Sequence, residues 1–155
     1  MSIARRHFAL LAAAAVICTA LPAVAAERAT PAEAQAMLAK AAAHLKAVGP
    51  EKALPEFMAK PGPWVDRDLY LSAYDMNGKT VSHINPRMVG KDNMNLQDAN
   101  GKFIIKERFE IVKAKGKGVQ EYSFLNPSTK QIEAKVMYFE KVGDLVLACG
   151  AYKPL

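Results

Sequence analysis

The sequence predicts an α+β domain built on an antiparallel sheet, and three observations lead to that class. Apolar residues before residue 60 repeat at three- and four-residue spacing, which indicates helices. Alternation with a period of two begins near residue 68 and returns in three runs after residue 118, which indicates strands. Two helices, two strands, a loop with a helix and three more strands then follow one another, and this order is typical of α+β folds.

The first two predicted elements are helices. Thr30 is a capping residue, Pro31 suits the first helical position, and Glu33 places an acid in the first turn. Gly49-Pro50 ends this helix, and a second short helix is predicted over residues 51–58. The apolar stripe of the first helix consists of Met37, Leu38, Ala41, Leu45 and Val48.

The five predicted strands cover residues 68–75, 80–84, 119–125, 131–141 and 145–152. In the first of them Tyr70 and Tyr74 share one face by parity. Asn77-Gly78 predicts a two-residue turn with positive φ angles, with Asp75 capping it through its side chain. Residues 87–102 are predicted to form a polar loop, and residues 103–113 a helix on top of the sheet.

Residues 1–25 have the features of a secretory signal peptide. Arg5 and Arg6 precede an apolar run over residues 8–21, and Ala23-Val24-Ala25 supplies small residues for cleavage. The run is shorter than the roughly 20 residues of a membrane-spanning helix. We therefore expect a signal peptide over 1–25 and one periplasmic domain over 26–155, with no membrane span in the mature chain.

Composition limits the function further. The chain has 51% hydrophobic residues, enough for one core, and a formal charge of +6, but its lysines are scattered. A nucleic-acid partner is not expected, because clustered arginines and interleaved aromatics are missing. Cys149, the one cysteine left after cleavage, lies in an apolar run and is expected to be a buried, inert thiol.

In their order along the chain, the motifs resemble a single Cache domain of the second type, an extracytoplasmic ligand-sensing module of bacterial receptors. They are Gly62-Pro63-Trp64, Tyr70, Tyr74-Asp75, Asn77-Gly78, His83, Pro86, Gly90-Lys91-Asp92, Leu96, Asp98, Gly101-Lys102, Gly116, Gly118, Tyr122, Asn126-Pro127, Lys135, Tyr138, Gly150 and Tyr152. The resemblance implies a long N-terminal helix against a PAS-like five-stranded antiparallel sheet. It also implies a small ligand, often a short organic acid, on the concave side of that sheet. Receptors of this family carry flanking transmembrane helices and an output domain. Because the sequence predicts neither of these features, we expect a free-standing secreted form here.

A pocket for a small carboxylate needs one or two cations and neutral donors within an apolar and aromatic wall. The predicted ligand-binding residues are Trp64 as an aromatic lid, Tyr70, Tyr74, His83, Arg87, Tyr122 and Lys135. Each has an alternative role. The tyrosines could simply pack under the N-terminal helix, Lys135 and Arg87 could face solvent, and His83 could be a hydrogen-bonded structural ring.

Signatures of catalysis are missing from the sequence. It has no Gly-x-Ser-x-Gly elbow, phosphate-binding glycine loop, paired cysteine motif or His-Glu-x-x-His, so no enzyme activity and no cofactor are expected. Asp92, Asp98 and Asn100 lack the ligand pattern of a calcium loop, so no metal is expected either.

Two functions fit these observations. The first is a periplasmic sensory module that binds a compact polar metabolite such as an organic acid, acting alone or relaying its state to a membrane receptor partner. The alternative is a structural or interaction protein that docks on an envelope or receptor complex without a ligand of its own. Dimerisation through the N-terminal helix would suit that second function.

Overall fold

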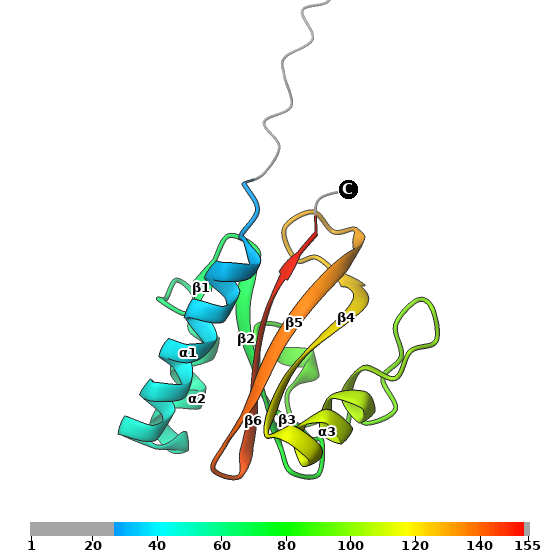
Figure 1. Ribbon diagram of the computed structural model, residues 1–155. Coiled ribbons are helices and arrows are strands. Elements are labelled where there is room, and N and C mark those ends of the chain that lie inside the picture. Colours follow the sequence, from blue (N-terminus) through cyan, green and yellow to red (C-terminus); the bar gives the residue numbers. More distant parts are fainter. Residues whose placement is uncertain (1–26, 154–155) are drawn as a thin grey trace, which may run out of the picture.

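The computed structural model describes residues 27–153, so the predicted signal peptide lies outside the described residues. One antiparallel sheet separates α1 and α2 on one face from α3 on the other (Figure 1). The elements are α1 Pro31–Val48, α2 Pro50–Met58, β1 Val65–Asp66, β2 Leu69–Asp75, β3 Thr80–His83, the 3-10 turn η1 Pro86–Met88, α3 Ile104–Lys115, β4 Lys117–Leu125, β5 Ile132–Val142 and β6 Leu145–Tyr152. Among the described helices, none has the length and apolar character needed to cross a bilayer.

The predicted α+β class with a PAS-like antiparallel sheet is confirmed. β2 lies between β3 and β6, and β5 and β4 follow, so the five predicted strands form one sheet in the order β3-β2-β6-β5-β4. The two-residue strand β1 pairs with the start of β2 and makes a sixth strand. The sequence did not predict β1, because two residues show no periodicity.

The start of α1 follows from its sequence. The Thr30 hydroxyl accepts a hydrogen bond from the Glu33 backbone N–H, and the Glu33 carboxylate accepts one from the Thr30 backbone N–H. This reciprocal capping box satisfies two backbone donors that the helix itself cannot pair. Gly49, with φ of 77°, ends α1, as predicted.

The turn between β2 and β3 differs from the prediction. Only Gly78 has a positive φ, of 85°, whereas a two-residue primed turn would need one at Asn77 as well. The Gly78 N–H donates to the Asp75 carbonyl, and the Asp75 N–H donates to the Lys79 carbonyl, so the loop has three residues. The prediction for Asp75 is confirmed, since its carboxylate accepts from the N–H groups of Asn77 and Lys79 at 2.9 and 3.0 Å.

Each face of the sheet carries its own hydrophobic core. The core under α1 and α2 includes Leu38, Leu45, Phe57, Leu71 and Cys149, and Cys149 is fully buried as expected. The core under α3 includes Tyr74, Ile105, Phe109, Tyr122 and Phe139. The alternation within each strand therefore divides the strand's residues between two different interiors.

Gly150 allows β5 and β6 to approach each other, and its replacement by alanine is expected to destabilise the fold. A Cβ at this position would lie 2.4 Å from the Val136 carbonyl oxygen and 2.9 Å from the Met137 Cα. Because both atoms belong to the backbone, the strands would have to shift, at a cost of about 1–3 kcal/mol. Urea unfolding measures this cost, and a loss below about 0.5 kcal/mol would contradict the expected clash.

Candidate functional site

Two cations lie fully buried on the face of the sheet that α3 covers. Lys135 comes from β5 and Arg108 from α3, and both are 0% exposed. The Nζ atom of Lys135 and the Nε and Nη1 atoms of Arg108 have no hydrogen-bond partner among the described residues. Buried charges in proteins are normally paired, because removing them from water is costly. These nitrogens therefore form a site suited to an anion.

Lys135 is surrounded by tyrosines. Strand pairing places Tyr122, Lys135 and Tyr152 in one row across β4, β5 and β6. The Lys135 Nζ lies 3.9 Å from the centre of the Tyr70 ring and 4.3 Å from that of Tyr152, so the aromatic faces replace part of its hydration. Burial lowers the pKa of Lys135 to about 7, and the nearby charge of Arg108 acts in the same direction.

Arg108 is held by aromatic rings in a similar way. The centres of the Tyr74, Tyr122 and Phe139 rings lie 5.3, 5.8 and 5.5 Å from its guanidinium carbon. Nη2 makes only long contacts, to Gln120 Oε1 at 3.4 Å and the Tyr122 hydroxyl at 3.5 Å. An arginine stays charged even when it is buried. Its planar fork is thus positioned but has few protein partners.

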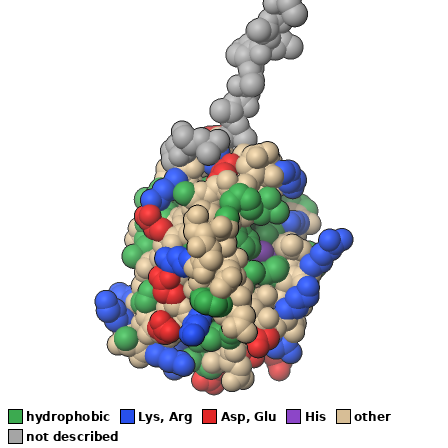
Figure 2. Space-filling model, turned by 90° about the vertical axis from the view of Figure 1, so that its right-hand side faces the viewer, with side chains coloured by type: hydrophobic (Ala, Val, Ile, Leu, Met, Phe, Trp, Pro, Cys, Tyr) green, Lys and Arg blue, Asp and Glu red, His purple; other side chains and the backbone are tan. Residues whose placement is uncertain are grey.

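A cavity of about 120 Å³ adjoins the surroundings of Lys135 through Tyr70, which lines the cavity and packs against the Lys135 Nζ. It is lined by Tyr70, His83, Ile84, Asn85, Met88, Phe124, Leu125 and Pro127. Figure 2 shows a histidine side chain recessed among hydrophobic side chains on the face turned to the viewer. The wall is therefore largely apolar and aromatic, with a few polar groups, as in other small-molecule sites.

His83 is neutral at pH 7. Its Nδ1 accepts a hydrogen bond from the Asn85 N–H at 2.9 Å, which leaves the proton on Nε2. Burial, together with the charge of the neighbouring Lys135, lowers the pKa of His83 to about 4. Its ring also packs edge-on against Tyr70, with 5.2 Å between the ring centres. His83 can therefore offer one N–H donor and no positive charge.

The tyrosine hydroxyls connect the cavity to the loop between β4 and β5. The Tyr152 hydroxyl donates to the Leu125 carbonyl at 2.8 Å and lies 3.3 Å from the Tyr70 hydroxyl. Burial raises the pKa of Tyr122 to about 12 and raises that of Tyr70 and of Tyr152 as well. All three remain neutral phenols that can donate hydrogen bonds at physiological pH.

Five of the seven predicted residues come together here. They are Tyr70, Tyr74, His83, Tyr122 and Lys135, and they lie on the face opposite α1 rather than under it. Lys135 is interior, not at a solvated strand edge. Trp64 lies elsewhere, against His44 and Phe57, with ring centres 5.2 and 5.0 Å apart. Arg87 lies on η1 and is exposed, so neither residue joins the cluster.

Sequence reasoning missed Arg108 and did not assign Tyr152 to the site. A helical arginine is usually solvated, which hides a buried one. A signal was nevertheless present: Arg108 is four residues from both Ile104 and Val112, so it occupies the apolar face of α3. The position of Tyr152 can be deduced only from the pairing of β5 with β6, because nothing in its local sequence places it beside Lys135.

A larger groove of about 560 Å³ lies on the other face, between α1 and the edge of the sheet. Leu38, Val119 and Tyr138 are among its lining residues. None of the unpartnered buried nitrogens of the described residues belongs to this lining. The smaller cavity is the candidate site, because Tyr70 in its wall packs against the Lys135 Nζ, although neither cation is itself among its lining residues.

Comparison with known proteins identifies the family. The model of the family Single Cache domain 2 matches residues 11–153. The chain belongs to this family. Solved structures agree: a methyl-accepting chemotaxis protein from Vibrio parahaemolyticus is 26% identical with a TM-score of 0.68, covering 78% of this chain and 86% of that one. A Cache chemosensory domain whose structure addresses carboxylic acid recognition is 22% identical with a TM-score of 0.62, covering 79% and 88%.

The Cache assignment confirms the resemblance deduced from the motifs. Cache domains are extracytoplasmic sensory modules, and those of chemotaxis receptors bind small ligands rather than catalyse reactions. A periplasmic sensor domain of a chemotaxis protein is 22% identical with a TM-score of 0.61, and the match covers 79% of this chain and 90% of that one.

Proposed function

We propose that this Cache domain is a sensory module that reversibly binds a small carboxylate in the cavity beside Lys135 and Arg108. The observation that carries the proposal is the set of three buried nitrogen atoms on two cations that lack partners among the described residues. A carboxylate supplies two acceptor oxygens and the opposite charge. The similar Cache domain known for carboxylic acid recognition supports this choice.

The size of the cavity limits the ligand. A water molecule takes about 30 Å³ in the liquid, so 120 Å³ corresponds to roughly four to six non-hydrogen atoms. Acids of about two to four carbons, such as acetate, propionate, lactate and pyruvate, are in this range. The apolar lining, which includes Met88 and Phe124, suits a short alkyl end.

The residues would divide the recognition between them. Arg108 would present its planar donors to the carboxylate, and Lys135 would add a point charge. The hydroxyls of Tyr70 and Tyr122 and the Nε2–H of His83 would donate further hydrogen bonds. Since this arrangement contains no activated nucleophile beside a general base, we propose binding without catalysis.

A thermal-shift screen with C2–C4 carboxylates tests this function. A ligand at 100 times its dissociation constant should stabilise the fold by about 2.7 kcal/mol and raise Tm by several degrees. The Arg108→Met variant should lose the shift, whereas Lys106→Met, which removes an exposed cation of the same helix, should keep it. Circular dichroism reports whether Arg108→Met is folded, and Arg108→Lys provides a second variant.

A screen without any shift in the wild-type protein would contradict the proposal. Equal shifts in the wild-type protein and a folded Arg108 variant would contradict the assigned site. The alternative function, docking on an envelope or receptor complex without a ligand, predicts no thermal shift with any carboxylate. The two unpartnered buried cations argue against it, because a protein without a ligand gains nothing from burying them.

The proposal includes a location and partners. Removal of residues 1–25 would release the domain 26–155 into the periplasm, where it would relay its ligand state to a membrane receptor. N-terminal sequencing of the exported protein should then begin at Ala26.

A homodimer would form through the exposed side of α1, where Ala36, Ala39 and Ala43 permit close approach of a second helix. Light scattering of the purified protein measures this association.

A further inference from the structure

The segment Arg28–Thr30, which we term the N-terminal latch, precedes α1 and is tied to the end of the sheet. The loop between β4 and β5, the turn between β1 and β2 and the end of β6 all lie at this end (Figure 1). The latch thus lies where three connections of the fold come together. Its contacts are of two kinds, one made by the Arg28 side chain and one by the backbone.

The first contact is an ion pair between Arg28 and the buried carboxylate of Glu133. Both terminal nitrogens of Arg28 donate to Glu133, whose side chain is 0% exposed. Asn126 Nδ2 and Thr129 Oγ1 also donate to it, at 2.9 and 2.6 Å. The hydrogen bonds from Arg28 first, and then those from Thr129 and Asn126, lower the pKa of Glu133 to about 2. The same carboxylate therefore holds the latch and the β4–β5 loop together.

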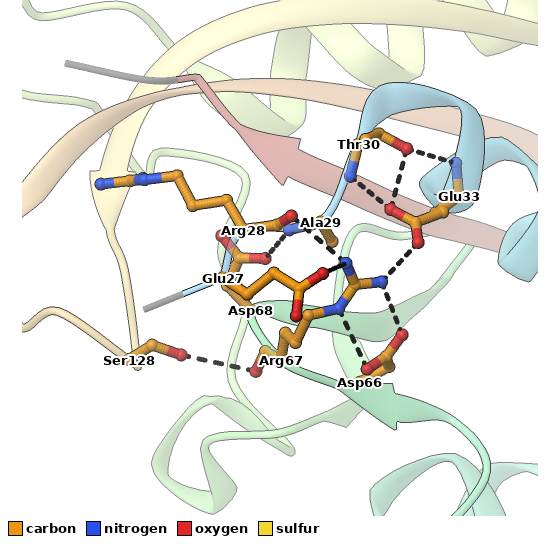
Figure 3. Close-up of polar contacts among 9 residues, drawn as sticks. All are labelled: Glu27, Arg28, Ala29, Thr30, Glu33, Asp66, Arg67, Asp68 and Ser128. Atoms are coloured by element: carbon orange, nitrogen blue, oxygen red, sulfur yellow. Dashed lines mark hydrogen bonds and ion pairs between the residues drawn. The ribbon is translucent and has the colours of Figure 1, made fainter. Parts of the chain in front are cut away.

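The second contact involves the backbone of the latch (Figure 3). The Ala29 N–H donates to Asp68 Oδ1 at 2.9 Å, and Arg67 Nη1 donates to the Arg28 carbonyl at 3.2 Å. Arg67 also pairs with Glu33 in the first turn of α1. These bonds attach the latch to the turn that leads into β2.

Several residues that hold the latch lie within two positions of a cavity residue or of Tyr152 in the chain. Asp68 lies two residues before Tyr70, and Asn126 lies between Leu125 and Pro127, which line the cavity. The Lys153 carbonyl, which accepts from Arg28 at 3.4 Å, directly follows Tyr152. A movement of the cavity wall would therefore reach the latch within one or two residues.

The cavity wall has to move when an anion reaches Lys135. The Lys135 Nζ lies between the rings of Tyr70 and Tyr152, within 4.3 Å of both ring centres. Because Nζ is buried with both rings packed against it, we expect a carboxylate that contacts Nζ to displace at least one of these rings. The Tyr152 hydroxyl is the donor to the Leu125 carbonyl, so its displacement frees the strand end that leads into Asn126.

We propose that filling of the cavity releases the N-terminal latch, through Tyr152, Leu125 and the Asn126–Glu133–Arg28 contacts. This inference rests on the proposed function, since it needs an anion at Lys135. The coupling is reciprocal by thermodynamic linkage, so a protein whose latch is broken binds the anion more tightly. Attachment or release of the N-terminal segment would then report whether the cavity is filled.

Amide hydrogen exchange at Ala29 tests the release, in the protein obtained from the full-length sequence. Saturation with propionate should accelerate exchange of the Ala29 N–H at least tenfold, because its bond to Asp68 is lost. Tyr152→Phe should accelerate it without propionate, because the bond to Leu125 is then missing. Unchanged or slower exchange in both experiments would overturn the release.

Affinity for propionate tests the reverse direction. Arg28→Ala should lower the dissociation constant for propionate at least fivefold, measured by calorimetry. Glu121→Gln is the matched control, because it breaks an exposed ion pair with Lys153 at the same end of the sheet and should leave the constant unchanged. An unchanged constant in Arg28→Ala, or an equal change in both variants, would contradict the coupling.

The two proposals fail in different ways. If propionate binds and raises Tm while Ala29 exchange stays constant, the sensor site stands and the latch is wrong. If propionate binds to no variant but Tyr152→Phe accelerates Ala29 exchange, the coupling stands and the carboxylate ligand is wrong.

Discussion

Replacement of Lys135 by methionine is expected to stabilise the unliganded protein at pH 7 and to abolish its response to carboxylates. The folded protein lowers the pKa of Lys135 from 10.5 to about 7, mainly through burial. Each pKa unit corresponds to about 1.4 kcal/mol, so the cost of the buried amine is on the order of 5 kcal/mol. Methionine fits the same space without this cost. Urea unfolding measures the gain, and thermal shift with propionate measures the loss of binding.

Lys141→Met is the matched control for this prediction. Lys141 lies on the same strand but is exposed, so its replacement should change stability by less than about 0.5 kcal/mol. Destabilisation by Lys135→Met would contradict the cost assigned to the buried amine. A retained propionate shift in that variant would show that Lys135 is not a ligand contact. The expected results, higher stability and lost binding in Lys135→Met, would mean that Lys135 serves function at the expense of stability.

The stability of the unliganded protein is expected to rise between pH 7 and 9. In this range the unfolded chain keeps the Lys135 proton, whereas the folded protein with its pKa of about 7 loses it, so unfolding takes up a proton. The slope should approach about 1.4 kcal/mol per pH unit. Above pH 9 the rise should level off, because burial raises the pKa of Cys149 from 9.0 to about 12, so the unfolded thiol loses its proton first and offsets the Lys135 contribution.

Propionate affinity should change in the opposite direction over the same range. A bound carboxylate favours the charged lysine, so affinity should fall above pH 7, by up to tenfold per pH unit. Arg108 stays charged and His83 stays neutral throughout this range, and Asp68 and Cys149 are the other titratable neighbours of Lys135. Lys135→Met should have a flat stability profile from pH 7 to 9. A wild-type profile that is flat as well, or an affinity independent of pH, would exclude titration of Lys135.

Local sequence was sufficient for most of the fold. Thr30, Pro31 and Gly49 set the limits of α1, and the alternation in β2 placed Tyr70 and Tyr74 on one face, because capping and side-chain parity depend only on neighbours along the chain. The turn at Gly78 was predicted in the right place but with the wrong geometry. The choice between two- and three-residue loops depended on how Asp75 pairs with Lys79 across the hairpin.

The candidate site was predictable only in part. Tyr122 and Lys135 could be selected as polar or aromatic residues in apolar strands, and the structure brings them together. Trp64 was chosen for its chemistry alone, and packing against His44 places it on the other side of the sheet. Arg87 was chosen because it is near His83 in sequence, but the 3-10 turn η1 leaves it exposed.

The sequence by itself determined the α+β class, the strand and helix positions, and the set of residue types suited to a small anion. Those properties follow from periodicity, capping and composition, which are local. Only the tertiary structure decided that Arg108 and Lys135 share one interior, that Tyr152 lies beside them, and that Arg28 reaches Glu133. These residues are far apart in the chain. Their contacts are therefore determined by the order of the strands and by packing across the sheet.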